Sequence, residues 1–220
     1  MQRKIIVTAD GSKTIQLIDW NEQYHSKHGA VQEAYHVFIK HGLQRFNNQH
    51  ISILEVGFGT GLNALITLVE SDRLNLTIDY TGVEAYPVLK NELAQLNYID
   101  ELKAENFEAQ FELMHGISWE EKIEIANNFT LVKQQKDFRE IDASANYNLI
   151  YFDAFGARVQ PELWTPELFE KMYVALKSKG VLVTYAAKGS VRRAMQQVGF
   201  TVERLPGPPG KREMLRALKP

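Results

Sequence analysis

Three polar features of this sequence have the residue types and spacing that chemistry requires: a glycine-rich segment, a glutamate and an aspartate. The first, Glu-Val-Gly-Phe-Gly-Thr-Gly, directly follows the apolar run Ile51–Val56. Its glycines allow a sharp turn and close approach to a ligand, and the helix expected after them presents free N–H groups. We therefore predict a polar ligand in contact with Glu55, Gly57, Phe58, Gly59, Thr60, Gly61 and Asn63.

The glycine spacing distinguishes two classes of cofactor. A dinucleotide fingerprint would place its third glycine at position 62, which is Leu62, and has no use for an acidic residue within the strand. The segment therefore favours S-adenosylmethionine. Glu84, at the end of the next apolar run, can accept hydrogen bonds from both ribose hydroxyls, although NAD would use it equally. Asp137, after the third predicted strand, either reaches the adenine edge or is a surface residue.

Asp153 is the candidate catalytic group. It follows the apolar run Tyr147–Phe152, and the carboxyl ends of central strands open into the ligand crevice of a doubly wound sheet. A carboxylate there can orient an amine nucleophile and accept its hydrogen bond, while Phe155 can shape the acceptor pocket. The alternative is that Asp153 is a turn or cap residue.

Neither role needs a metal, and none is expected. The six histidines are scattered, and the closest pair, His25 and His28, lacks a nearby third ligand. With no cysteine, the chain can form neither disulfides nor thiolate metal sites. No stretch approaches a membrane span or a secretory signal, so we expect a cytoplasmic protein without membrane contact.

The charge is distributed unevenly along the chain. The formal net charge is −2, yet the segment from Lys177 to Pro220 holds ten basic and two acidic residues, a net +8. Such a basic face suits contact with phosphates; the alternative is ordinary solvated surface. The candidates for substrate or RNA contact are Arg158, Lys188, Arg192, Arg193, Lys211 and Arg212.

Apolar runs alternate with helical patterns, which predicts a doubly wound, mostly parallel α/β sheet. The predicted strands are Ile51–Val56, Leu76–Val83, Phe129–Val132, Tyr147–Phe152 and Val181–Tyr185, followed by an antiparallel pair, Phe200–Arg204 and Arg212–Leu218, at the edge of the sheet. Helices are expected over Ala30–Phe46 and Pro166–Leu176, solvated helices over Tyr98–Ala126, and an extended cap over Met1–His28. We expect one domain over residues 1–220, with an N-terminal cap or extension (1–48) and a Rossmann-like core (49–220).

Together these motifs resemble the methyltransferase half of the MnmC family, which makes the tRNA wobble base 5-methylaminomethyl-2-thiouridine. The segments that carry the resemblance are Gly57–Asn63, Asp153 with Phe155, and Gly210–Met214. The resemblance implies a Rossmann-like class I methyltransferase with seven strands, the last antiparallel. It also implies an S-adenosylmethionine cofactor approached by Tyr24 and Glu33, and Asp153 and Phe155 placed against the aminomethyl group of 5-aminomethyl(-2-thio)uridine in a tRNA anticodon loop.

Two features depart from the family pattern. Ala154 and Gly156 stand where family members show glycine and alanine-proline, so the acceptor loop can differ. The family's bifunctional members also carry an FAD-dependent oxidase, so a stand-alone enzyme would need a separate enzyme to supply the aminomethyl precursor. Two alternatives remain open: an N-methyltransferase for a small-molecule amine, and a non-catalytic module that binds cofactor and RNA.

Overall fold

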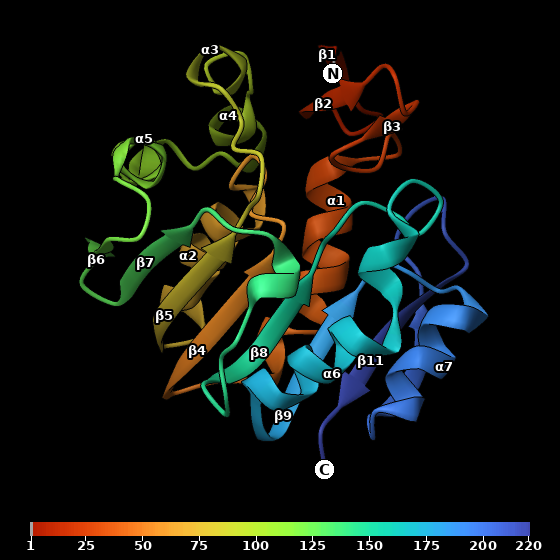
Figure 1. Ribbon diagram of the computed structural model, residues 1–220. Helices are drawn as coiled ribbons and strands as arrows, with labels where there is room; N and C mark the ends of the chain where they lie inside the picture. Colours follow the sequence, from red (N-terminus) through yellow and green to blue (C-terminus); the bar gives the residue numbers. More distant parts are fainter. Residues whose placement is uncertain (1) are drawn as a thin grey trace.

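The computed structural model describes residues 2–220, and its centre is a mixed eight-stranded sheet (Figure 1). Across the sheet the strands are β10 (Thr201–Pro206), β11 (Glu213–Leu218), β9 (Leu176–Thr184), β8 (Tyr147–Phe152), β4 (Gln49–Val56), β5 (Leu76–Val83), β7 (Phe129–Gln134) and β6 (Lys122–Ala126). The five strands from β9 to β7 are parallel, and β10, β11 and β6 run antiparallel to their neighbours.

The chain winds away from the centre of the sheet in two directions. From β4 it passes through α2 (Leu62–Arg73) to β5, and from β8 through α6 (Pro166–Ala175) to β9. The two winding directions separate between β4 and β8, which pair in parallel with Val56 opposite Phe152. Ligands of doubly wound sheets bind at this point, outside the carboxyl ends of the strands. The predicted doubly wound fold and the antiparallel C-terminal pair are confirmed.

Both faces of the sheet are covered by helices (Figure 1). Ile51 and Ile53 of β4 pack against α1 (Ala30–Ala34), its continuation η1 (Tyr35–Lys40) and α2. Leu54 and Val56 pack on the opposite face against α6 and α7 (Gly189–Gln197). Side chains alternate across a strand, so a strand buried on both faces is apolar almost throughout. This explains why the central strands were readable from the sequence.

A small antiparallel sheet lies beyond the carboxyl ends of the central strands, at the top of Figure 1. Its strands are β1 (Arg3–Val7), β2 (Lys13–Leu17) and β3 (Glu22–Gln23). We call residues 2–28 the cap. The remaining elements are η2 (Leu43–Arg45), α3 (Lys90–Leu93), α4 (Tyr98–Leu102), η3 (Glu105–Phe107), α5 (Glu108–Gly116), η4 (Phe138–Glu140) and η5 (Pro161–Trp164). Of the residues described, 2–220, none belong to a helix long and apolar enough to cross a membrane.

Two sequence expectations need correction. The helix predicted over Ala30–Phe46 ends at Lys40, because the chain turns at Gly42, where a Cβ would lie 2.5 Å from the Phe38 carbonyl oxygen. The sheet has eight strands rather than seven, because Lys122–Ala126 forms β6 instead of a solvated helix. A turn joins β6 to β7, and the two strands pair as an antiparallel hairpin.

A test of the packing beneath the glycine loop is Gly82→Ala. A Cβ on Gly82 of β5 would lie 2.3 Å from the buried ring of Phe58 and 3.1 Å from its Cβ, so the whole side chain would have to move. We expect the free energy of unfolding to fall by about 1–3 kcal/mol, measured by urea unfolding with circular dichroism. Thr77→Ala, exposed on the same strand, is the matched control. Equal stability of the two variants would contradict this packing.

Candidate active site

A large cavity lies over the carboxyl ends of the central strands. Its volume is about 1660 Å³, beyond the roughly 300–1,000 Å³ of a site for one small molecule. The loops after β4, β5, β8 and β9 line it from below, and the cap lines it from above. Fifteen predicted site residues line it: Tyr24, Glu33, Gly57, Phe58, Gly59, Thr60, Asn63, Glu84, Asp137, Asp153, Phe155, Arg158, Lys188, Lys211 and Arg212.

The glycine loop has the backbone that its sequence predicts. Gly57, Gly59 and Gly61 have φ values of +99°, +49° and +75°, a region that favours glycine. A Cβ on Gly57 would lie 2.7 Å from the backbone oxygen of Asp153. The missing side chain therefore lets the loop after β4 lie directly against the loop after β8. α2 begins at Leu62, directly after the loop, which places its free N–H groups at the cavity.

Glu84 joins the glycine loop to the end of β5. Its carboxylate accepts hydrogen bonds from the backbone N–H of Gly59 at 3.1 Å and of Tyr86 at 2.9 Å. Burial raises the pKa of Glu84, although both hydrogen bonds oppose this shift. Each carboxylate oxygen has a further lone pair. The carboxylate can therefore hold the loop and accept hydrogen bonds from ligand hydroxyls.

Asp153 is held by a chain of buried polar groups. The Asn63 amide donates to Asp153 Oδ2 at 2.9 Å and to Glu55 Oε1 at 2.8 Å, and the Tyr80 hydroxyl donates to Glu55 Oε2 at 2.9 Å. Burial, and then the negative charge of Glu33, raise the pKa of Asp153 to about 7, against the opposing effects of Asn63 and Lys211. A carboxyl group with this pKa can exchange a proton at neutral pH.

Four predicted site residues lie outside the cavity: Glu55, Gly61, Arg192 and Arg193. The prediction of direct cofactor contact by Glu55 is therefore corrected. Both of its oxygens are occupied by Asn63 and Tyr80, and burial raises its pKa well above the ordinary value. Glu55 acts on the site through Asn63, which donates to both Glu55 and Asp153.

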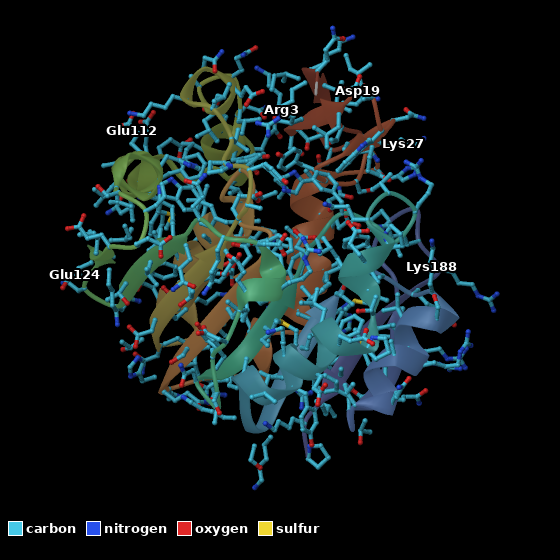
Figure 2. All side chains as sticks on the ribbon, in the orientation of Figure 1. Arg3, Asp19, Lys27, Glu112, Glu124 and Lys188 are labelled. Carbon is cyan, nitrogen blue, oxygen red and sulfur yellow. The ribbon has the colours of Figure 1, made fainter. Side chains whose placement is uncertain are left out.

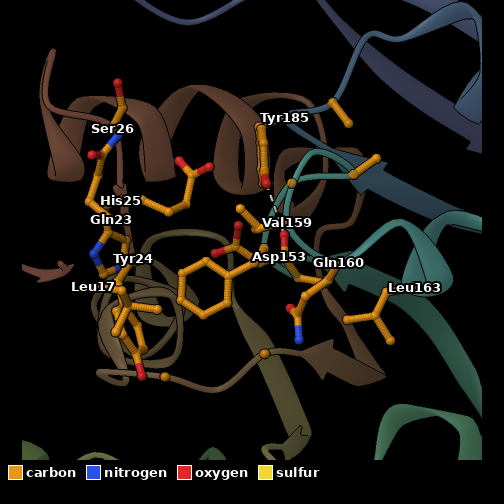
Figure 3. A pocket seen from close by; sticks show the side chains of 18 of the residues that line it. Leu17, Gln23, Tyr24, His25, Ser26, Asp153, Val159, Gln160, Leu163 and Tyr185 are labelled. Carbon is orange, nitrogen blue, oxygen red and sulfur yellow. Dashed lines mark hydrogen bonds between the residues drawn. The ribbon is translucent and has the colours of Figure 1, made fainter. Parts of the chain in front are cut away.

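Aromatic rings form the wall beside Asp153. Phe155 meets the rings of Tyr24 and Trp20 edge to face, with centroids 5.1 and 5.8 Å apart. The Tyr185 hydroxyl donates to the backbone oxygen of Ala154 at 2.8 Å, and Figure 3 shows Asp153 lying between Tyr24 and Tyr185. Sequence reasoning missed Trp20 and Tyr185. Tyr185 comes directly after β9, so the rule that strand ends carry functional residues could have found it; nothing in the sequence marks Trp20.

Two arginines fasten the cap to the core. Arg3 pairs with Glu92 at 2.9 Å, just before the end of α3. Arg158 pairs with Glu22 at 2.9 Å and donates to two backbone oxygens of the cap. The guanidinium of Arg158, predicted to contact substrate or RNA, is thus directed at the cap. All four side chains of these two ion pairs line the cavity.

The predicted basic residues fall into two groups. Lys211 turns inward, where it pairs with Glu33 and lies 3.9 Å from the centroid of the Tyr185 ring. Glu33, predicted to approach the cofactor, therefore has one oxygen bonded to a cation and the other to the N–H of Ser26. The other four predicted residues have no ion-pair partner within residues 2–220; they are Lys188, Arg192, Arg193 and Arg212. Figure 2 shows Lys188 extending outward from the core. We call these four residues the basic rim.

Two further polar groups of the cavity have partners of their own. Asp137 accepts two hydrogen bonds from the Arg139 guanidinium, which lowers the pKa of Asp137, and its contact with adenine stays a prediction. His25 bonds to the Thr14 hydroxyl at 2.9 Å, and burial lowers the pKa of His25 to about 4. Residues 2–220 contain no cluster of three His, Asp or Glu side chains placed to hold a metal.

Comparison with known proteins agrees with this geometry. Residues 95–220 match the model of a family described as S-adenosyl-L-methionine-dependent methyltransferase. The chain belongs to this family. The cofactor of this methyltransferase is S-adenosylmethionine, and the positive-φ glycines, the free helix start and Glu84 fit its polar and ribose groups.

Relatives cover nearly the whole chain. A tRNA 5-methylaminomethyl-2-thiouridine biosynthesis bifunctional protein MnmC from Hydrogenovibrio crunogenus is 29% identical over 228 residues, which cover 96% of this chain and 33% of the relative. One from Cupriavidus necator is 30% identical over 211 residues, covering 89% and 31%. The methyltransferase chain thus spans about a third of the length of these curated relatives.

Solved structures show the same architecture. The crystal structure of MnmC2 from Aquifex aeolicus matches with a TM-score of 0.79 and 27% identity over 98% of this chain and 69% of that chain. Spermidine synthase from Thermotoga maritima matches with a TM-score of 0.53 and 12% identity, covering 98% and 72%, which shows the fold alone. The Rossmann-like class I methyltransferase fold is therefore confirmed.

Replacing Glu84 by glutamine tests the ribose contact. The variant keeps the size of the side chain but removes the charge that strengthens its hydrogen bonds, so we expect binding of S-adenosylhomocysteine to weaken about tenfold or more. Isothermal titration calorimetry measures this directly. Glu112→Gln, exposed on α5 outside the cavity, is the matched control. Unchanged affinity in Glu84→Gln would remove Glu84 from the cofactor site.

Proposed function

We propose that this methyltransferase transfers a methyl group to the primary amine of 5-aminomethyl(-2-thio)uridine at the tRNA wobble position. The observation that carries the proposal is the placement of Asp153, held by Asn63 between the glycine loop and an aromatic pocket. The bifunctional MnmC relatives are named for biosynthesis of tRNA 5-methylaminomethyl-2-thiouridine, which supports this choice of acceptor.

The chemistry requires a neutral amine. A primary alkylamine is largely protonated at neutral pH, so its nitrogen has no free lone pair until one proton leaves. Asp153, with a pKa of about 7, can take that proton from the ammonium group. S-adenosylmethionine supplies the sulfonium methyl: the nitrogen–methyl bond forms as the sulfur–methyl bond breaks, and S-adenosylhomocysteine leaves. Asn63 keeps Asp153 Oδ2 oriented, and Phe155 and Tyr24 exclude water beside it.

The basic rim fits an RNA backbone. Lys188 and Arg212 line the cavity, and Arg192 and Arg193 follow on α7. An unstacked anticodon base can enter a cavity without opening a duplex, while nearby cations bind its flanking phosphates. In this proposal residues 1–48 and 49–220 act as one domain in the cytoplasm, and a separate enzyme supplies the aminomethyl precursor.

Asp153→Asn tests the catalytic role. The variant keeps the shape of the side chain but cannot accept the amine proton, so we expect transfer to tRNA lacking the modification to fall about 10²-fold or more. Labelled S-adenosylmethionine and nucleoside mass spectrometry measure the product, and calorimetry should show retained binding of S-adenosylhomocysteine. Asp142→Asn, an exposed carboxylate outside the cavity, is the control. Methylation at the wild-type rate would exclude Asp153 as the base; label on small amines alone would exclude tRNA.

Charge reversal tests the basic rim. In Lys188→Glu and Arg212→Glu we expect weaker tRNA binding and a salt slope lower by about one for each lost phosphate contact. Filter binding at several salt concentrations measures both quantities. Lys179→Glu is the matched control, because Lys179 is exposed in the same basic segment but lies near the start of β9, away from the cavity. A salt slope equal to that of the control would count against phosphate contact.

A further inference from the structure

Glu33 and Lys211 form an ion pair in the cavity that holds Asp153, and both charges act on the Asp153 carboxyl group. The pair joins α1 to the loop before β11, across 178 positions of sequence. The Glu33 side chain is 11% exposed and that of Lys211 is 31% exposed, and the Lys211 ammonium also faces the Tyr185 ring. The free energy needed to remove both charges from water offsets much of their Coulomb attraction, so two apolar side chains at these positions would stabilise the fold to a similar extent. The pair therefore calls for a reason other than stability.

Asp153 is surrounded by titratable groups from every neighbouring element. Glu55 of β4 and Tyr80 of β5 lie beneath it, Tyr185 follows β9, and Glu33 reaches it from α1. Burial raises the pKa of Tyr80 and Tyr185 well above their ordinary values, so both hydroxyls are neutral near pH 7. Burial also raises the pKa of Glu55, and Asn63 bonds to both Glu55 and Asp153 and so links them.

Most other acidic groups of the cavity have local partners, and none of them is among the charges that shift the pKa of Asp153. Glu84 bonds to the glycine loop, and Glu22 pairs with Arg158. Beside Asp153 this leaves two carboxyl groups, its own and that of Glu33, and one cation, Lys211.

The sign of each interaction follows from these charges. Glu33 disfavours a negative charge on Asp153, and Lys211 favours it. If Lys211 were absent, the two carboxylates would face each other without a counter-ion, and one of them would hold a proton at neutral pH. A protonated Asp153 could not accept a proton from an amine.

We propose that Glu33 and Lys211 form a positioning pair, in which Lys211 offsets the charge of Glu33 so that Asp153 remains a free proton acceptor for the substrate amine. This inference rests on the proposed role of Asp153 in methyl transfer. It assigns Lys211 to the chemistry of the pocket rather than to tRNA phosphates, for which the sequence alone nominates it. The cation–π contact with Tyr185 fixes where the ammonium lies.

Two measurements on the full chain test the proposal. The first is a pH titration of the Asp153 carboxyl carbon by ¹³C NMR in the S-adenosylhomocysteine complex, with Asp153→Asn to assign the signal. The second is the pH dependence of kcat/KM for tRNA methylation. The variants are Lys211→Met, Glu33→Gln, the double variant and Lys211→Arg; melting temperatures show which of them are folded.

We expect Lys211→Met to move the Asp153 titration upward by about one pH unit or more, and Glu33→Gln to move it downward. The double variant should titrate between the two single variants and somewhat below the wild type, because Glu33 raises the pKa of Asp153 more than Lys211 lowers it. Lys211→Arg keeps the positive charge and should titrate like the wild type. The rising limb of kcat/KM should shift in the same directions, because Asp153 acts in its deprotonated form.

Other outcomes separate the possible failures. An Asp153 titration that is unmoved in Lys211→Met and Glu33→Gln overturns the proposal. If Lys211→Met then raises KM and flattens the salt slope, Lys211 is a phosphate contact; if it only lowers the melting temperature, the pair is a structural bridge. Titration shifts as expected without any methylation of tRNA would uphold the charge coupling and refute the proposed acceptor instead.

Discussion

The site depends on one close backbone approach at the centre of the sheet. The loop after β4 and the loop after β8 lie side by side because position 57 has no side chain; a Cβ there would meet the Asp153 backbone oxygen at 2.7 Å. The Asp153 N–H also donates to the backbone oxygen of Val56 at 2.9 Å, which continues the pairing of the two strands into their loops. This contact holds the glycine loop and the carboxyl group proposed as the base together.

The polar network under that contact orients Asp153, but it requires several polar side chains to be removed from water. Burying polar groups is tolerable only when each has a partner. Tyr80, Glu55, Asn63 and Asp153 form a sequence of hydrogen bonds from the core to the cavity, although the Asn63 Oδ1 atom is buried without a partner among the described residues. Glu55 can lie wholly buried because Asn63 and Tyr80 donate to its two oxygens, and burial raises its pKa; burial raises the pKa of Asp153, at the cavity end, to about 7. The network therefore ends at Asp153, whose carboxyl group lines the cavity.

How far the sequence could predict this structure depends on whether a feature is local. The central strands are apolar runs because both of their faces are buried, and the residues after them must lie at one edge of the sheet, so Glu84 and Asp153 could be placed from position alone. The strand β6 was missed although isoleucines at 123 and 125 alternate with charged residues, because the surrounding acidic residues suggested a solvated helix.

Contacts between distant segments could not be predicted. Nothing near Arg158 shows that its guanidinium bonds to the cap, more than a hundred positions earlier in the chain. The partner of Lys211 is equally distant, on α1. The sequence shows where the basic residues stand in the chain, but the tertiary fold decides whether each side chain faces solvent or a buried carboxylate.

In the basic C-terminal segment, the partners that the tertiary fold gives each cation decide which of them can contact a substrate. Of its ten cations, Arg204, Lys211 and Arg216 pair with carboxylates, and Lys177 and Lys219 donate to neutral oxygens. Lys179 lies at the opposite end of β9 from the cavity. Of the ten cations, the four of the basic rim are therefore those on or near the cavity without a carboxylate partner within residues 2–220. A patch of this size, beside a cavity large enough for cofactor and acceptor together, suits a few phosphates flanking one inserted base better than a long nucleic-acid duplex.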